Sequence, residues 1–353
     1  MSANIDLPAN VALLLNSKLE TEYATVSGAG VPIDTPTAFF AREGFRRFDT
    51  TSGLAYPAKA ERARRNPKVG LLIEGARGEP VVSIAGMAAI RDTDLQANAE
   101  RYLAEAALHT LKLRATNPAD KGQFPWSEAR KAVWYWTRVF IEITPKRILW
   151  WDNAEMMDSA PHRWDAPADT IFPASDPDPK GQVSAAPKWP QEPWRDMAKD
   201  AVDKGLPGHL TLLDEAGHPL PIRASNIRLT DDGFDLDVPA GAPWAARSGT
   251  ATLTFLALYT FVGQVTDLGT VHFHVERALP VLPMMKNFEE LFSPSESTYA
   301  ALMARLNHEV ARRGQAIPVM PHELPPSTAG YFRRQARIEN KIDAISTEYT
   351  KNV

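Results

Sequence analysis

The residues best suited to chemistry lie between positions 48 and 68. Three residues with side-chain hydroxyls stand together there, Thr50, Thr51 and Ser52, and Lys59 follows. We expect a strand to deliver the hydroxyls into a turn, with a helix opening near Pro57. Hydroxyls, an ammonium group and the free N–H groups of a helix N-terminus can all donate hydrogen bonds to an anion. The pattern therefore indicates a site for a phosphate-type group.

A simpler explanation exists for the same residues. Serine is a common N-cap residue, and a lysine on a surface helix is usually solvated. Spacing alone favours this simpler explanation, in which Ser52 caps a surface helix and Lys59 points into solvent. The anion-binding interpretation therefore depends on the rest of the sequence.

The first half of the chain reads mostly as strands. The expected strands span residues 22–27, 32–40, 44–49, 68–74, 80–90, 138–144 and 147–151, and the expected helices span 57–65, 93–113 and 127–136. Gly86 inside one strand predicts a bulge or a close approach of backbones. A capping box is expected to begin at Thr93. Several short strands at this spacing predict a β-barrel or sandwich with a helical insertion over 93–136.

A proline-rich segment divides the chain. Eight of the 29 prolines lie between residues 153 and 193, where they exclude a helix. We expect an extended linker that lies over the surface. The predicted organisation is a first barrel over 1–152, the linker over 153–193, a second, degenerate barrel over 194–285 and a helical extension over 286–353.

The second half shows the same kinds of element. It is expected to hold a helix over 192–204, strands over 209–213, 220–229, 233–238, 250–258, 259–265 and 270–275, and two helices, one capped at Ser293 and one over 331–348. Three landmarks recur in the same order in both halves. They are residues 24–26 and 210–212, residues 82–86 and 259–263, and residues 139–143 and 271–275. This order predicts a mainly β protein with two copies of one barrel.

Composition excludes several classes of protein. The 353 residues carry a formal net charge of −4, so no basic field points to nucleic acid. The chain has no cysteine, which excludes disulfides and thiolate chemistry. No apolar run reaches the ~20 residues needed to span a bilayer, and the N-terminus lacks the pattern of a secretory signal. We therefore expect a cytoplasmic protein with no membrane or nucleic-acid partner.

An ordered set of short motifs carries a family resemblance. The motifs are Gly30-Val31-Pro32, Phe48-Asp49-Thr50-Thr51, Lys59, Asn66-Pro67-Lys68-Val69 and Gly86-Met87-Ala88. In this order they resemble the pyridoxamine 5′-phosphate oxidase-like family of FMN-binding split barrels. The resemblance covers about residues 18–152. The second half resembles the fold more weakly and lacks the Thr-Thr, Lys and Asn-Pro elements.

The resemblance implies a fold, a cofactor and a site. It implies six-stranded split barrels that pair and bind a flavin in the groove between them, in a homodimer. By the resemblance, Thr50, Thr51 and Lys59 would hold the cofactor phosphate. We expect the neighbouring Ser52 to contribute to the same site. The strand that contains Ile33, Asp34 and Thr35 would lie along the flavin ring.

The predicted function is a flavin-dependent oxidoreductase that acts on a small organic, possibly aromatic, substrate. FMN is the expected cofactor, with F420 or haem as alternatives. The alternative function is a flavin- or haem-binding module of the same fold without redox chemistry. Because a cofactor would carry the reaction, the sequence identifies no catalytic side chain.

Two further groups could bind ligands, but simpler explanations are favoured. Trp134 and Trp136 could stack on a flavin, although buried aromatic residues are more often packing residues. His272 and His274 share one face of a strand and could bind a metal or haem. No recognisable ligand set accompanies them in the sequence, so we expect no metal site.

Overall fold

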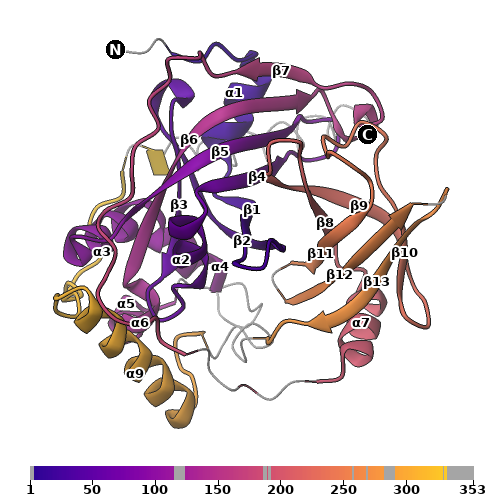
Figure 1. Cartoon of the computed structure of the whole chain (residues 1–353). Helices are drawn as coiled ribbons and strands as arrows, with labels where there is room; N and C mark the ends of the chain where they lie inside the picture. The colour runs from indigo at the N-terminus through magenta and orange to yellow at the C-terminus, as the bar shows by residue number, and fades with distance from the viewer. Residues whose placement is uncertain are drawn as a thin grey trace, which may run out of the picture.

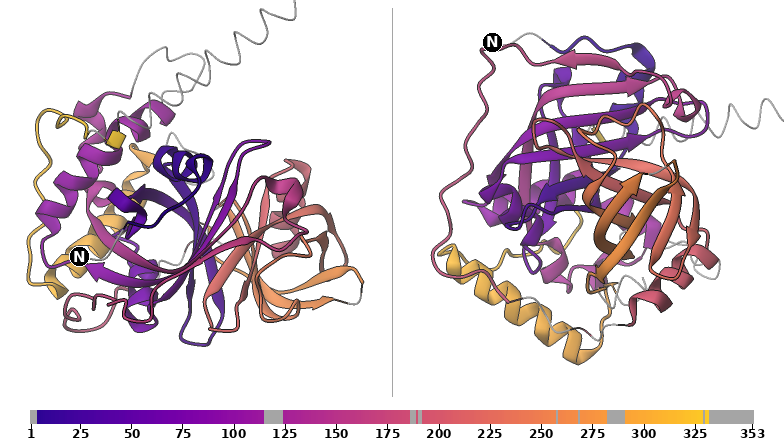
Figure 2. Two further views of the ribbon diagram at one scale, coloured as in Figure 1. Left: turned by 90° about the horizontal axis from the view of Figure 1, so that it is seen from above. Right: turned by 45° about the vertical axis from the view of Figure 1, so that its right-hand side comes forward.

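A computed structural model of the chain shows two β-barrels that lie side by side (Figures 1 and 2). The structure describes residues 4–114, 124–185, 189, 192–256, 258–267, 269–281, 291–328 and 330–331. Nearly all of the expected helix over 331–348 and the expected boundary at 285/286 lie outside these ranges. Within them, no helix has the length and apolar character to cross a membrane.

The first barrel has six antiparallel strands in the order β3-β2-β1-β4-β5-β6, and β3 pairs with β6 to close it. The strands are β1 (Glu20–Val26), β2 (Pro32–Ala41), β3 (Phe48–Gly53), β4 (Lys68–Glu74), β5 (Val81–Arg91) and β6 (Arg138–Trp151). Tyr23, Leu71 and Ile84 stand opposite one another on three neighbouring strands and are fully buried. These three side chains point into the barrel. Because side chains alternate along a strand, the residues before and after each of them point out of the barrel.

The second barrel repeats this order strand for strand, as β10-β9-β8-β11-β12-β13. Its strands are β8 (Gly208–Leu213), β9 (Pro219–Leu229), β10 (Gly233–Asp237), β11 (Gly249–Phe255), β12 (Tyr259–Asp267) and β13 (Val271–Ala278). The register shifts at Gly86 in β5 and at Gly263 in β12, which occupy corresponding places. A Cβ atom at Gly263 would lie 1.8 Å from the backbone oxygen of His274, so the bulge needs glycine. The predicted tandem split barrels are confirmed.

The helices between β5 and β6 distinguish the first barrel from the second. They are α3 (Leu95–Tyr102), a π-helical segment (Leu103–Ala107), α4 (Leu108–Arg114), α5 (Trp126–Ala129) and α6 (Val133–Trp136). The N-cap of α3 is Asp94, which accepts a hydrogen bond from the Ala97 N–H, and not Thr93 as expected. The reason is tertiary, because the N–H and hydroxyl of Thr93 both donate to Asp176 of the linker.

Two strand predictions in the first barrel were wrong in detail. The strands expected over 138–144 and 147–151 form one continuous strand, β6, whose Pro145 stands opposite Gly86 at the bulge. The strand expected over 44–49 begins only at Phe48, because Gly44 lies in a tight turn with a φ of 69°. As a result, the three hydroxyl residues lie inside β3 and not in a turn after it.

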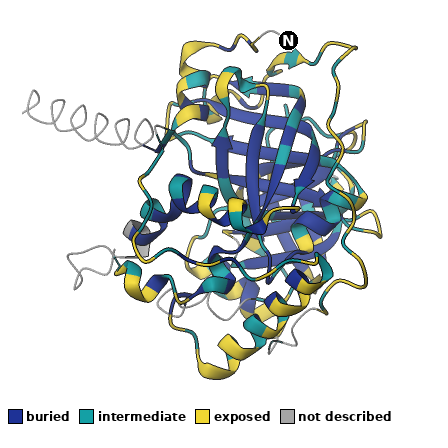
Figure 3. Cartoon of the chain, turned by 90° about the vertical axis from the view of Figure 1, so that its left-hand side faces the viewer, coloured by how far each residue is buried: buried dark blue, intermediate teal, exposed yellow. Residues whose placement is uncertain are grey.

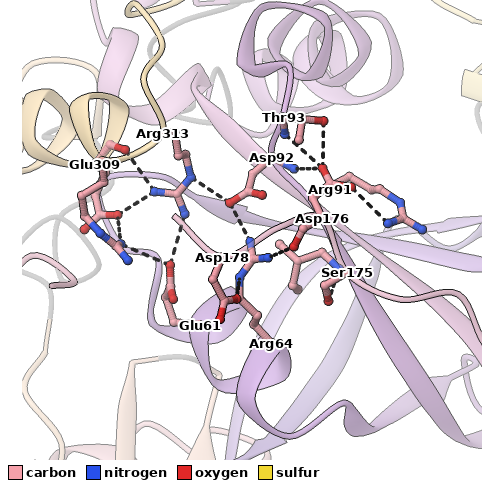
Figure 4. A network of polar contacts seen from close by, with 12 residues as sticks. Glu61, Arg64, Arg91, Asp92, Thr93, Ser175, Asp176, Asp178, Glu309 and Arg313 are labelled. Carbon is pink, nitrogen blue, oxygen red and sulfur yellow. Dashed lines mark hydrogen bonds and ion pairs between the residues drawn. The ribbon is translucent and has the colours of Figure 1, made fainter. Parts of the chain in front are cut away.

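The proline-rich linker is attached to the first barrel more closely than expected. His162–Asp165 forms a short strand, β7, which pairs with β6 and extends the first sheet to seven strands. Farther along, the Asp176 carboxylate accepts hydrogen bonds from the N–H groups of Asp92 and Thr93, at 2.8 and 3.0 Å (Figure 4). The linker therefore lies against the barrel surface and contributes to its sheet.

A buried ionic network joins the last described helix, α9 (Glu296–Arg312), to the first barrel (Figure 4). Arg313, just beyond α9, contacts Asp92 at 2.8 Å, Glu309 at 2.7 Å and Glu61 of α2 (Ala58–Arg65) at 3.1 Å. Figure 3 shows that the helix has one buried and one exposed face. Removing one partner of such a buried network leaves an unpaired charge, so α9 is firmly held.

The two barrels pack through their sheets. The backbones approach closely between β4 and β9, where a Cβ atom at Gly70 would lie 1.7 Å from the Pro219 oxygen. An apolar cluster fills the space beside this point and includes Leu72, Trp151 and Ile222. The barrel pairing that the homodimer prediction assumed therefore occurs within one chain. Self-association of the chain stays a prediction.

The first test concerns this close approach. We expect Gly70→Ala to destabilise the protein by about 1–3 kcal/mol, because the Pro219 carbonyl cannot yield without moving a strand. Denaturant unfolding would measure the change. Gly28→Ala is the control, since a Cβ atom there meets no atom within 4 Å. Equal losses of stability in the two variants would contradict the proposed constraint.

Candidate functional site

Strands β2 and β3 pair over only three residues each and then separate. The ladder joins Phe39–Ala41 to Phe48–Thr50. Beyond it, Lys59 Nζ donates to the Pro36 oxygen at 3.0 Å and Thr37 Oγ1 donates to the Thr51 oxygen at 2.8 Å. Where the two strands diverge, hydrogen bonds from side chains thus take the place of the backbone hydrogen bonds of the ladder. We call this place, between residues 33–38 of β2 and 51–53 of β3, the β2–β3 gap.

The three predicted hydroxyls are not equivalent at this gap. Thr50 Oγ1 donates to Thr37 Oγ1 at 3.0 Å, and Ser52 Oγ donates to the Tyr56 oxygen at 3.0 Å. Both are thereby engaged within the protein. Thr51 is also buried, but its hydroxyl has no hydrogen-bond partner in the described part of the chain. Of the three, Thr51 is best placed to bind a ligand.

Lys59 lies in the first turn of α2 and is partly buried. Burial, followed by the positive charges of Arg62 and Arg138, lowers its pKa to about 8. Asp34 and Glu22 oppose this shift. Keeping Lys59 protonated in this environment is therefore unfavourable. An anion bound beside it would stabilise the protonated form.

The structure adds Arg138, which the sequence analysis missed. It stands opposite Gly53 on the neighbouring strand, and its guanidinium group lies over the rings of Tyr102 and Tyr135, at 4.7 and 4.2 Å from their centroids. Its Nε atom is buried without a partner among the described residues. The sequence marks Arg138 only as the first residue of a strand, so its position near the gap was not predictable.

Arg305 of α9 is a second residue that the sequence did not reveal. Its Nε atom donates to the Ala55 oxygen at 2.7 Å, and its guanidinium group lies over the Tyr56 ring. Both residues belong to the turn between β3 and α2. Arg305 Nη1 and the Tyr56 hydroxyl are buried and find no partner in the described ranges. About 250 residues separate the two sides of this contact, and no local pattern signals it.

These residues fit a phosphate group. Buried polar groups almost always have partners, so several unpartnered donors around one turn mark a place for a ligand. The donors of Thr51, Arg138 and Arg305 surround the turn that Lys59 follows. The chain reaches α2 through Pro57, so the free N–H groups of the helix N-terminus lie at the same place.

Ile33, Asp34 and Thr35 form the part of β2 that lies between the gap and the second barrel. Ile33 is buried, and the Asp34 backbone oxygen accepts a hydrogen bond from Thr254 Oγ1 of β11 at 3.3 Å. The Thr35 hydroxyl has no partner in the part of the chain that the structure describes. The predicted cofactor-binding strand is thus next to the predicted phosphate residues.

The second barrel has no equivalent site. Strand β10 corresponds to β3 but reads Gly-Phe-Asp-Leu-Asp, without a hydroxyl. The described residues 238–248 that follow it contain no helix comparable to α2. Within the described residues, the elements expected to bind an anion therefore occur in the first barrel and not in the second.

The remaining candidates have structural partners. His272 contacts Asp235 and Asp232 at 2.9 and 3.2 Å, and His274 contacts Asp232. The described residues nevertheless contain no group of histidine and acidic side chains arranged to hold a metal ion. Trp136 is fully buried and stacks on Phe292, so it serves packing as expected.

Matches to known proteins are found among solved structures. No protein-family model and no curated protein matches the chain. Solved structures that match include a pyridoxamine 5′-phosphate oxidase-related, FMN-binding protein from Nostoc punctiforme, at 13% identity and a TM-score of 0.30. It covers 41% of this chain and 86% of its own.

Two other solved structures have similar scores. A protein of the pyridoxinephosphate oxidase family from Clostridium acetobutylicum is 14% identical, with a TM-score of 0.32 over 46% of this chain and 96% of its own. An F420 reductase is 17% identical, with a TM-score of 0.29 over 40% of this chain and 98% of its own. The chain resembles the pyridoxamine 5′-phosphate oxidase-like split barrels. Its fold assignment rests on the two closed barrels themselves.

The second test concerns the cost of the Lys59 charge. Because its pKa is lower in the folded than in the unfolded protein, folding is opposed at neutral pH and becomes more favourable as pH rises from about 8 to 10. We expect Lys59→Met to stabilise the ligand-free protein at pH 7 by about 1–3 kcal/mol. Denaturant unfolding at pH 7 and pH 10 would show the gain shrinking. A gain of the same size at both pH values would contradict this explanation.

Proposed function

We propose that the chain is a flavin-dependent oxidoreductase whose first barrel holds the cofactor phosphate at the β2–β3 gap. One observation carries the proposal, namely that Lys59 and the unpartnered donors of Thr51, Arg138 and Arg305 surround a single turn. Arginine and lysine are the side chains best suited to phosphate oxygens. FMN is the cofactor we favour; F420 also carries a phosphate group, and haem carries carboxylates.

In this proposal, the residues of the chain bind and orient the cofactor. Lys59 and Arg138 supply positive charge, and the Thr51 hydroxyl donates a hydrogen bond to the phosphate. Ile33, Asp34 and Thr35 would contact the remainder of the cofactor. A bound flavin supplies the transfer of hydride or electrons, which no side chain of the chain can perform.

The substrate we propose is a small organic molecule of aromatic character. The half-buried ring of Tyr135 lies against the Arg138 guanidinium group at the candidate site. Such rings favour flat, apolar partners. A flavin- or haem-binding module without redox chemistry is the second candidate. It is favoured by the second barrel, whose described residues lack a counterpart of the candidate site and so fit a scaffold role.

Absorption spectroscopy and cofactor titration form the third test. We expect the protein to bind FMN or F420 and to show flavin-type bands. We expect Lys59→Ala and Arg138→Ala each to weaken binding at least tenfold, because each removes a charged donor to phosphate, worth about 1.4 kcal/mol or more. Bleaching of the flavin band by an electron donor, followed by recovery on adding an acceptor, would separate the oxidoreductase from the binding module.

Lys131→Ala is the matched control for this titration. Lys131 is an exposed lysine of the helical insertion, paired only with Glu128, so its loss should leave affinity unchanged. A Soret band in place of flavin bands would favour haem. Unchanged affinity in the folded Lys59→Ala protein would remove the phosphate assignment.

A further inference from the structure

A buried group of charged side chains lies where the two barrels meet. Glu22 of β1, Asp34 of β2 and Glu74 of β4 share the face of the first sheet that packs against the second barrel, which contributes His209 of β8. The strand register explains their proximity, because Glu22 stands opposite Pro36 and opposite Leu72, each two residues from another of the acids. We call these four residues the interface acid cluster.

His209 links two of the acids across the contact. Its side chain is 4% exposed, its Nδ1 atom lies 3.4 Å from Glu22 Oε1, and its Nε2 atom lies 2.9 Å from Glu74 Oε2. Nε2 forms a hydrogen bond with Glu74, whereas Nδ1 makes a close contact with Glu22 that lacks hydrogen-bond geometry. Although burial by itself raises the pKa of Glu74, the hydrogen bond and charge of His209 lower it below its ordinary value. Glu74 is therefore the ionised member of the cluster.

Glu22 and Asp34 behave differently, because they face each other. Asp34 is fully buried, and neither of its carboxylate oxygens receives a hydrogen bond from a donor group of the described chain. Glu22 Oε2 is buried and equally without a donor. Burial raises the pKa of Asp34 to about 6, against the opposing effects of His209, Glu22 and Lys59. Burial and the Asp34 carboxylate raise the pKa of Glu22 well above its ordinary value.

The positive charges around the cluster leave both Asp34 oxygens and Glu22 Oε2 without a hydrogen bond in the described chain. Lys59 of α2 acts on both Glu22 and Asp34 but is itself partly buried, and Arg223 of β9 lies 3.9 Å from Glu74. Lys18, after the first helix, also acts on Glu74. Strand β11, which packs on β2, contains no ionisable residue. Two carboxylates in such a site hold one proton between them.

We propose that Glu22 and Asp34 bind one shared proton at the contact between the barrels, and that release of this proton to solvent weakens the contact. The proton is the only species that leaves, and the acid pair gains one negative charge. Because the site faces the second barrel, the added charge must be accommodated by water entry or by separation of β1 and β2 from β8. This inference does not depend on the identity of the cofactor.

The predicted pH dependence follows from the direction of the shift. An acid with a higher pKa in the folded than in the unfolded protein stabilises the fold at low pH, and this contribution is lost as pH rises through the folded pKa. We therefore expect the pair to weaken the fold between about pH 4 and pH 7. Over pH 5–8, Glu74 stays ionised and contributes no change, since its pKa lies below its ordinary value.

The fourth test compares Asp34→Asn with the unaltered protein over pH 5–8. Denaturant unfolding should show the unfolding equilibrium constant of the unaltered protein rising by on the order of 10- to 100-fold with pH, while Asp34→Asn loses most of this change. Hydrogen exchange should show β1, β2 and β8 opening more readily at pH 8 than at pH 5, only in the unaltered protein. Glu22→Gln removes the same shared proton and replaces Asp34→Asn if that variant does not fold.

Asp267→Asn is the matched control, because Asp267 of β12 pairs with Arg247 on the second barrel and is not a member of the interface acid cluster. It should keep the pH dependence of the unaltered protein. The same pH dependence in Asp34→Asn and Glu22→Gln as in the unaltered protein would overturn the proposal. Loss of flavin binding would not, since these measurements use the ligand-free protein.

Discussion

The close packing of the two barrels is the constraint on which the rest of the structure depends. At Gly70, the backbones of β4 and β9 approach so closely that no side chain fits between them. This contact buries an apolar cluster around Leu72 and Ile222, and it also buries Glu22, Asp34 and His209. Apolar area favours the contact, while the desolvated charges oppose it unless they are paired or protonated. Apolar packing therefore stabilises the interface, while the buried acids destabilise it when their shared proton is released.

The two barrels have the same strand order but different roles, because their connections differ. The first barrel has α2 after β3 and several helices between β5 and β6. In the second barrel, residues 238–248 contain no helix comparable to α2, and three residues separate β12 from β13. Two barrels with the same strand order can differ in function, because function depends on the side chains that each barrel carries. The first barrel carries the residues that we propose to bind an anion. The second contributes the opposing face, with His209 as its charged contact.

Distant segments complete the candidate site. The linker and α9 are held on the first barrel by Arg64, Asp92, Glu309 and Arg313, whose charges are almost fully buried (Figure 4). The same attachment places Arg305 against the turn between β3 and α2. Burying these charges is unfavourable unless each of them has a partner of opposite charge. The attachment thereby brings Arg305 of α9 to the candidate site of the first barrel.

The sequence by itself determined the elements whose signals are local. Alternating apolar residues located most strands, Pro57 located the start of α2, and Gly86 marked the bulge. Three landmarks repeated in the same order in both halves predicted two barrels. The ordered motifs of the first half placed the candidate site near Thr51 and Lys59. These signals need only neighbouring residues, since side-chain alternation and glycine geometry are properties of a short stretch of backbone.

Only the tertiary structure decided which side chains meet. It placed the hydroxyl run inside β3, moved the cap of α3 from Thr93 to Asp94, and brought Arg138 and Arg305 to the same turn. It also set His209 between two acids of the other barrel. The contacts of Arg138, Arg305 and His209, and the contact between Thr93 and Asp176 that displaces the cap, join residues that are far apart in the chain. Strand pairing and charge burial determine them, and neither property is contained in any local run of residues.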